Sequence, residues 1–132
     1  ASAVANGGEL MKPRLVDRVV DRDGRTTERF EPERQERVMR PETAEKVTEM
    51  MASVVREGSG TAAALAGIEV AGKTGTAEKN VQTRLNQPWF IGFAPRSNPK
   101  FAVAVTIEES VGGTGGDVAA PIAKQVLQEL LR

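Results

Sequence analysis

A cation, two hydroxyl groups and a glycine come together in the four consecutive residues Lys73-Thr74-Gly75-Thr76. On a β-strand, Thr74 and Thr76 point to the same side, because successive side chains alternate between the two faces. Both hydroxyls can then donate to one carboxylate, with the fixed positive charge of Lys73 nearby. Gly75 lets a substrate backbone lie close, and the N–H of Thr76 can point at a developing oxyanion. The motif therefore predicts recognition of a carboxylate beside an oxyanion hole.

Three strands are predicted around this motif. Residues 68–76 alternate and are rich in β-branched side chains, which indicates the strand that carries the motif. Residues 89–94 and 101–108 are predicted to form an antiparallel hairpin, with a turn at 95–99 between them. The polar stretch 79–88 is predicted to be a loop.

Apolar residues at helical spacing predict one helix on each side of these strands. The first begins at Pro41, with Glu42 in its first turn, and ends at Gly58-Ser59-Gly60. The second covers residues 117–131, after a flexible loop at 112–116. Its buried face is predicted to consist of Val118, Ile122, Val126 and Leu130. The fold class is therefore expected to be α+β, with an antiparallel sheet flanked by helices.

The first 40 residues predict a helix end and a hairpin. Residues 1–6 have the character of a helix end, because Asn6-Gly7-Gly8 can adopt the left-handed conformation that follows one. Two short extended segments within 15–30 are joined by a turn at Asp23-Gly24. Residues 31–40 are predicted to be a charged connector exposed to solvent.

Composition narrows the chemistry that the chain can perform. Its 18 Lys and Arg balance 18 Asp and Glu, so no net field attracts nucleic acid or an anionic membrane. The sequence has no His, Cys or Tyr, which excludes a Ser-His-Asp triad, a thiol nucleophile and a His or Cys zinc site within these residues. Any base here must be Lys, Asp or Glu, and no metal or cofactor is expected. No apolar run approaches the roughly 18 residues of a membrane span.

Two other motifs match sites of different chemistry. Residues 67–74 fit the phosphate-loop pattern G-x-x-x-x-G-K-[ST], but such a loop opens a helix, whereas Gly75 follows at once and the intervening residues favour a strand. A nucleotide-binding protein stays open as a less favoured alternative. Ser97 and Lys100 fit S-x-x-K, but Pro99 predicts an exposed turn in place of the helix that this chemistry needs.

The flanks of the Lys-Thr-Gly-Thr motif resemble, in order and spacing, those of the penicillin-binding transpeptidase family. The matching stretches are Ala5 to Gly8, Met11 to Pro13, Asp21 to Gly24, Arg40 to Ala44, Val54 to Ala62, Ala71 to Glu78, Trp89 to Pro95 and Ala119 to Ala123. They cover essentially the whole chain and look most like the class B, monofunctional branch. Residues 1–132 are therefore expected to be the C-terminal segment of one transpeptidase domain of the serine β-lactamase-like fold. Its hairpin and helical part lie at 1–66, and the motif strand, antiparallel hairpin and last helix at 67–132.

This resemblance implies a serine enzyme that cross-links peptidoglycan. In the family, a Ser is acylated by the D-Ala-D-Ala end of a stem peptide, an amine of a second stem takes the acyl group, and β-lactams trap the acyl-enzyme. The resemblance implies that Lys73 gives electrostatic support near the donor carboxylate. It also implies that Thr74, Gly75 and Thr76 bind the substrate, and that the N–H of Thr76 is half of the oxyanion hole.

The resemblance also implies partners outside this chain. The family's Ser-x-x-Lys and Ser-x-Asn motifs precede the Lys-Thr-Gly strand, and neither is present here in usable form. The remainder of the domain is expected to carry them, with a membrane anchor on the extracytoplasmic side farther upstream, so this segment alone is expected to be inactive. Stem peptides and β-lactams are the expected ligands, and nucleic acid is not. A non-catalytic β-lactam-binding sensor module stays open, and the residues before Ala1 distinguish it from the enzyme.

Overall fold

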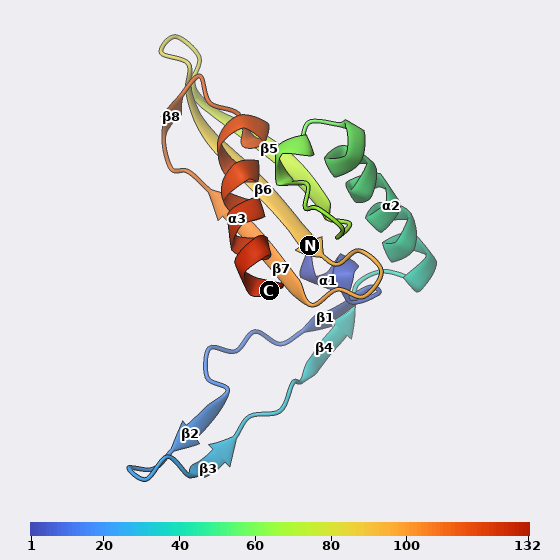
Figure 1. Cartoon of the computed structure of the whole chain (residues 1–132), viewed down its shortest axis with the longest axis vertical. Helices are drawn as coiled ribbons and strands as arrows, with labels where there is room; N and C mark the ends of the chain where they lie inside the picture. Colours follow the sequence, from blue (N-terminus) through green and yellow to red (C-terminus); the bar gives the residue numbers. More distant parts are fainter.

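A computed structural model describes all residues from 1 to 132 and has an antiparallel four-stranded sheet at its centre (Figure 1). The sheet has the order β5 (Ala71–Asn80), β6 (Leu85–Ala94) and β7 (Phe101–Thr106), and β8 (Ser110–Val111) pairs with β6 as well. Since β5 pairs only with β6, its other edge is free. The predicted α+β class and the predicted β6–β7 hairpin are confirmed.

The side chains of β6 fill the core on both faces of the sheet. Phe90 and Phe93 are completely buried and point to opposite faces, because they are three residues apart on one strand. Phe90 packs in a cluster with Leu127 of the last helix, whereas Phe93 packs with Met51 of the long helix. Val55 of that long helix also reaches the Phe90 cluster, so the helix runs along the β5 side of the sheet (Figure 1).

The long helix α2 (Pro41–Glu57) forms where it is predicted. Pro41 has no N–H to leave unpaired in the first turn, and Glu42 complements the partial positive charge there. The buried residues recur at helical spacing and are Ala44, Thr48, Met51, Ala52 and Val55. The helix ends at Gly58, and a short 3₁₀ helix at Thr61–Ala63 follows.

Helix α3 (Ala120–Leu130) begins three residues later than predicted. A π-helical turn at Gly115–Ala119 precedes it. The hydroxyl of Thr114 caps this turn, since it accepts the N–H of Asp117 at 3.2 Å and donates to the carboxylate of Asp117 at 2.7 Å. Gly115 and Gly116 of the predicted flexible loop thus belong to an ordered helix start.

The prediction of the buried face of α3 is wrong. Ile122, Val126 and Leu130 are 37%, 41% and 47% exposed. The buried positions of α3 are Ala120, Ala123 and Leu127. Apolar residues occupy more of this helix than one face, and its buried alanines lie in the same hydrophobic cluster as Phe90.

The predicted bounds of the motif strand and of the following loop are partly wrong. The prediction placed the strand at 68–76 and the loop at 79–88. In the structure β5 starts at Ala71 and continues to Asn80, and only 81–84 lie between it and β6. This end of the β5–β6 hairpin is polar and largely exposed, so it lacks the alternation from which a strand is predicted.

A two-stranded ribbon extends away from the sheet between α1 (Ser2–Ala5) and α2 (Figure 1). Its strands pair antiparallel, β1 (Glu9–Met11) with β4 (Arg34–Arg37) and β2 (Arg18–Val20) with β3 (Thr26–Arg29). The predicted helix end before it and the predicted hairpin turn are confirmed, and Gly24 in that turn has a φ of 80°. None of the helices is long and apolar enough to span a membrane.

The predicted connector at 31–40 is wrong in part, because it contains strand β4. This strand is held by backbone pairing with β1 and by Glu9, which forms ion pairs with Arg34 at 3.5 Å and with Arg37 at 2.8 Å. All residues of β4 are exposed. A strand that depends on charges and backbone hydrogen bonds leaves no apolar pattern in the sequence.

Candidate active site

The backbone of the Lys-Thr-Gly-Thr motif faces the free edge of the sheet. Thr76 on β5 pairs with Pro88 on β6, and the carbonyl of Pro88 accepts the N–H of Ile107 on the β7 side at 3.1 Å. The backbone carbonyl of Pro88 therefore faces β7, and the Thr76–Pro88 pair is one without mutual hydrogen bonds. The N–H of Thr76 thus points away from β6. The same holds for the backbone groups of Thr74, two residues earlier.

The side chains of Thr74 and Thr76 lie on one side of β5, as alternation predicts. Their positions are roughly 6.8 Å apart along the strand. Their cross-strand partners Phe90 and Pro88 are buried on the same side, which is the side that α3 covers. Thr74 is half-buried and Thr76 is exposed. Two hydroxyls at this spacing can each reach one oxygen of a single carboxylate.

Lys73 projects to the opposite face, but its ammonium group returns to the free edge. The Nζ atom donates to the carbonyl oxygen of Thr74 at 2.7 Å. The stem of Lys73 lines an apolar groove of about 430 Å³, together with Val47 and Met51 of α2 and Ile91 of β6. The aliphatic stem therefore lies on apolar surface, while the charge lies beside the motif backbone.

Each threonine hydroxyl has a partner that the sequence did not indicate. The Oγ of Ser59 lies 2.6 Å from the Oγ1 of Thr74. The N–H of Gly115 donates to the Oγ1 of Thr76 at 3.2 Å. In the sequence these two residues belonged to a helix end and to a flexible loop. The concentration of glycines in both segments was the available signal, because glycines allow backbones to approach closely.

Two glycines bring the segment before α3 against the motif. A Cβ atom on Gly115 would lie 2.2 Å from the carbonyl oxygen of Trp89 and 2.5 Å from that of Gly75. A Cβ atom on Gly116 would lie 2.4 Å from the carbonyl oxygen of Ser59. Side chains do not tolerate such distances, so both positions require glycine. The motif strand, the Ser59 turn and the start of α3 therefore form one tightly packed unit.

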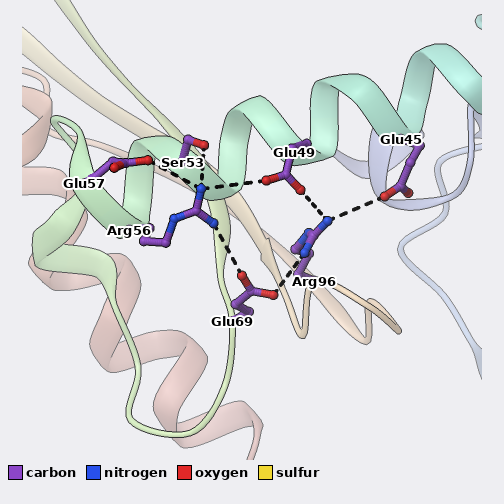
Figure 2. Close-up of polar contacts among 7 residues, drawn as sticks. All are labelled: Glu45, Glu49, Ser53, Arg56, Glu57, Glu69 and Arg96. Carbon is purple, nitrogen blue, oxygen red and sulfur yellow. Dashed lines mark hydrogen bonds and ion pairs between the residues drawn. The ribbon is translucent and has the colours of Figure 1, made fainter.

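An ion-pair cluster holds the start of β5 (Figure 2). Arg96, in the turn between β6 and β7, forms ion pairs with Glu69 at 3.2 Å, with Glu45 at 3.6 Å and with Glu49. Arg56 of α2 lies 3.7 Å from Glu49 and 3.8 Å from Glu69. Two arginines and three carboxylates thus join α2, the β6–β7 turn and the residues just before the motif strand.

The carboxylates around Arg96 raise the pKa of its guanidinium above the ordinary value. The hydrogen bond to Glu69 is the largest cause, desolvation opposes it, and the charges of Glu49 and Glu45 act in the raising direction. A guanidinium is charged at all working pH values even before such a shift. The cluster therefore does not switch through loss of the Arg96 proton.

Known proteins match the chain over nearly its whole length. A family model of the penicillin binding protein transpeptidase domain matches residues 1–128. The chain belongs to the penicillin-binding protein transpeptidase family. It is 38% identical to the peptidoglycan D,D-transpeptidase PbpA of Mycolicibacterium smegmatis, with 100% of this chain and 28% of that protein covered. It is 34% identical to the stage V sporulation protein D of Bacillus subtilis, with 98% of this chain and 21% of that protein covered.

Solved transpeptidase structures share the fold. The ceftriaxone acyl-enzyme complex of penicillin-binding protein A from M. tuberculosis has a TM-score of 0.90 and 35% identity, covering 99% of this chain and 30% of that one. The D,D-transpeptidase domain of a peptidoglycan glycosyltransferase from Eggerthella lenta has a TM-score of 0.85 and 38% identity, with 98% and 30% covered. The chain thus spans less than a third of these relatives, and the predicted family and fold are confirmed.

Within this transpeptidase segment, the two competing motifs lack the geometry that their chemistry requires. Residues 67–74 run from a loop into β5, and the strand continues past Thr74 where a phosphate loop would open a helix. Ser97 and Lys100 lie in the turn between β6 and β7, as predicted, and not on a helix. The nucleotide alternative and a Ser97 nucleophile are therefore not supported by the structure.

Proposed function

We propose that the complete protein is a peptidoglycan D,D-transpeptidase and that β5 binds its donor substrate. The observation that carries the proposal is the placement of the Thr74 and Thr76 hydroxyls on one side of a free strand edge, to which the N–H of Thr76 points. A D-Ala-D-Ala donor ends in a carboxylate one residue beyond the carbonyl that reacts. It therefore needs hydroxyl donors and an oxyanion hole close together, and β5 offers both.

In the proposed reaction the remainder of the domain supplies the Ser nucleophile. Its Oγ attacks the carbonyl carbon of the penultimate D-Ala, and the N–H of Thr76 stabilises the oxygen that becomes negative. The C–N bond then breaks, and D-Ala leaves after its nitrogen receives the proton that the Ser hydroxyl lost. An amine of a second stem peptide attacks the resulting ester, and the proton that it loses restores the Ser hydroxyl. Throughout, Lys73 lowers the energy of the negative charges at this edge.

The proposal implies a place of action and a set of ligands. Peptidoglycan is built outside the membrane, so the enzyme would act on the extracytoplasmic face. Stem peptides and β-lactams would be its ligands, because a β-lactam presents a carboxylate next to a reactive amide in the same way. In support, penicillin-binding protein A from M. tuberculosis, a relative of this chain, forms acyl-enzyme complexes with ceftriaxone, imipenem and penicillin G.

Mass spectrometry of the full-length protein with benzylpenicillin tests the proposal. We expect one covalent adduct, which peptide mapping places on a Ser outside residues 1–132. Ser97→Ala is the matched control and should form the adduct unchanged. An adduct on Ser97, or on any other residue of this segment, would contradict the proposal that β5 binds the substrate while the nucleophile lies elsewhere in the protein.

A second measurement distinguishes the enzyme from a non-catalytic β-lactam-binding module. The full-length protein is supplied with a D-Ala-D-Ala peptide and a labelled D-amino acid as acceptor. A transpeptidase incorporates the label and releases D-Ala, whereas a sensor module forms the β-lactam adduct without incorporating the label.

A further inference from the structure

Ser59 lies outside the Lys-Thr-Gly-Thr motif, but its hydroxyl contacts the motif directly. Its Oγ is 2.6 Å from the Oγ1 of Thr74, and this is the one side-chain hydrogen bond that either residue makes. Ser59 is exposed and Thr74 is half-buried. The contact therefore forms at an accessible surface, beside the strand that the proposed function assigns to the substrate. Packing of buried groups alone does not explain it.

The number of protons on the hydroxyls of Thr74 and Thr76 indicates which residue donates in the hydrogen bond between Ser59 and Thr74. A hydroxyl has one proton to donate and two positions that accept. At Thr76 the N–H of Gly115 occupies an accepting position, so the proton of Thr76 stays available for a ligand. If Ser59 donates to Thr74, the proton of Thr74 is available in the same way. The hydroxyls of Thr74 and Thr76 then both accept a hydrogen bond from the protein and can donate one to a ligand. In such a chain of hydrogen bonds, each bond strengthens the next.

We propose that Ser59 is a positioning residue, which donates to Thr74 and thereby turns the Thr74 proton toward the carboxylate of the substrate. The inference rests on the proposed function, because it assumes that Thr74 binds this carboxylate. Either hydroxyl can donate in the free protein. A bound carboxylate selects one direction, since the charge-assisted bond from Thr74 is stronger than a neutral bond to Ser59.

The backbone holds Ser59 in the position that this role requires. The N–H groups of Gly58 and Gly60, on either side of it, both donate to the carbonyl of Val54, at 3.1 and 2.9 Å. Gly116 packs against the carbonyl of Ser59 itself. The end of α2 and the start of α3 therefore fix the Ser59 hydroxyl before a substrate binds, which is the preorganisation that a positioning group needs.

The test measures the second-order rate of acylation of the full-length protein by benzylpenicillin. Ser59→Ala should slow acylation about three- to tenfold, the range for loss of one neutral hydrogen bond, and Ser59→Thr should restore it. The methyl ester of benzylpenicillin has no carboxylate, so Ser59→Ala should leave its rate unchanged. Ser53→Ala removes a hydroxyl of α2 that bonds only Arg56 and should have no effect on either rate.

A Thr74→Ala background separates positioning from a general structural role. In that background Ser59→Ala should cause no further loss, with melting temperatures unchanged throughout. Equal losses with and without Thr74, or equal losses for the acid and its ester, would overturn the inference. If Thr74→Ala slows acylation and Ser59→Ala does not, the role of Ser59 is excluded and the proposed function still stands. If Thr74→Ala itself has no effect, the assignment of Thr74 under the proposed function fails, and the role of Ser59 fails with it.

Discussion

Arg96 binds Glu69 through both its side chain and its backbone. The guanidinium Nη1 lies 3.2 Å from the carboxylate, and the N–H of Arg96 donates to the carbonyl of Glu69 at 2.8 Å. Glu69 stands two residues before β5, and Arg96 stands two residues after β6. This double contact therefore closes the end of the β5–β6 pair next to Lys73, and the carboxylates of α2 join it there (Figure 2).

Replacement of Arg96 by Gln is expected to lower the melting temperature of the full-length protein. Glu45, Glu49 and Glu69 would lose the cation that they share and would repel one another. The loss should shrink at high salt, because salt screens this repulsion. Arg132→Gln is the control, since Arg132 pairs only with Glu129 at an exposed site. Thermal unfolding at low and high salt gives the melting temperature of both variants. Equal shifts in melting temperature for Arg96→Gln and Arg132→Gln would show that the cluster stabilises the fold no more than an exposed ion pair does.

Thr76→Val is expected to slow β-lactam acylation about tenfold to a hundredfold, since a charge-assisted hydrogen bond is worth roughly 1.5–3 kcal/mol. The backbone N–H survives, so some activity should remain. The variant should also lose about 1 kcal/mol of folding stability, because the N–H of Gly115 loses its acceptor. Thr76→Ser keeps the hydroxyl and should retain both properties. The measurements are acylation rates and unfolding midpoints, and a Thr76→Val rate equal to wild type would remove this strand from the site.

Lys73→Met is expected to slow acylation on the order of a hundredfold, the upper end of the effect of a charge-assisted contact. Met keeps an apolar chain in the groove with Val47, Met51 and Ile91, so the fold should persist. Lys73→Ala removes the chain as well and should also lower the melting temperature. Stopped-flow acylation and thermal unfolding separate the two effects, and full activity of Lys73→Met would exclude an electrostatic role.

Gly72→Ala is expected to destabilise the protein by about 1–3 kcal/mol, the usual cost of overpacking a core. A Cβ atom on Gly72 would lie 2.3 Å from the ring of Phe90, which is completely buried. A Cβ atom on Gly75 would meet only the Cβ of Trp89, at an ordinary 3.4 Å, so Gly75→Ala should fold normally. Denaturant unfolding of both variants checks this difference between two glycines of one strand.

Local patterns in the sequence were sufficient for the motif strand, the β6–β7 hairpin and helix α2. Each is encoded by neighbours in the chain: alternation across 68–76, a proline turn at 95–99, and Pro41 with Glu42 at a helix start. The roles assigned to Lys73 and Thr76 stay predictions, but the free edge on which they depend is present in the fold.

Long-range contacts decide the features that the sequence did not indicate. Strand β4 pairs with β1, and its Arg34 and Arg37 form ion pairs with Glu9, more than twenty residues away in the chain. The buried face of α3 is the one that joins the hydrophobic cluster around Phe90, which includes Ala123, whereas Ile122 stays exposed. The pattern of apolar residues predicts neither strand β4 nor the buried face of α3. Such a pattern describes a single helix or strand and not the surface against which it packs.

The ribbon between Glu9 and Arg37 contains no buried residue, whereas β6 buries most of its second half. Segments with so few apolar contacts open on their own, and their amides exchange with solvent at little cost in free energy. The amides of the buried half of β6 are expected to exchange only at a much higher cost in free energy. We therefore expect the ribbon and the central sheet to open as separate units. A substitution at the tip of the ribbon is therefore expected to alter amide protection there and to leave the contacts of Lys73 and Thr76 unchanged.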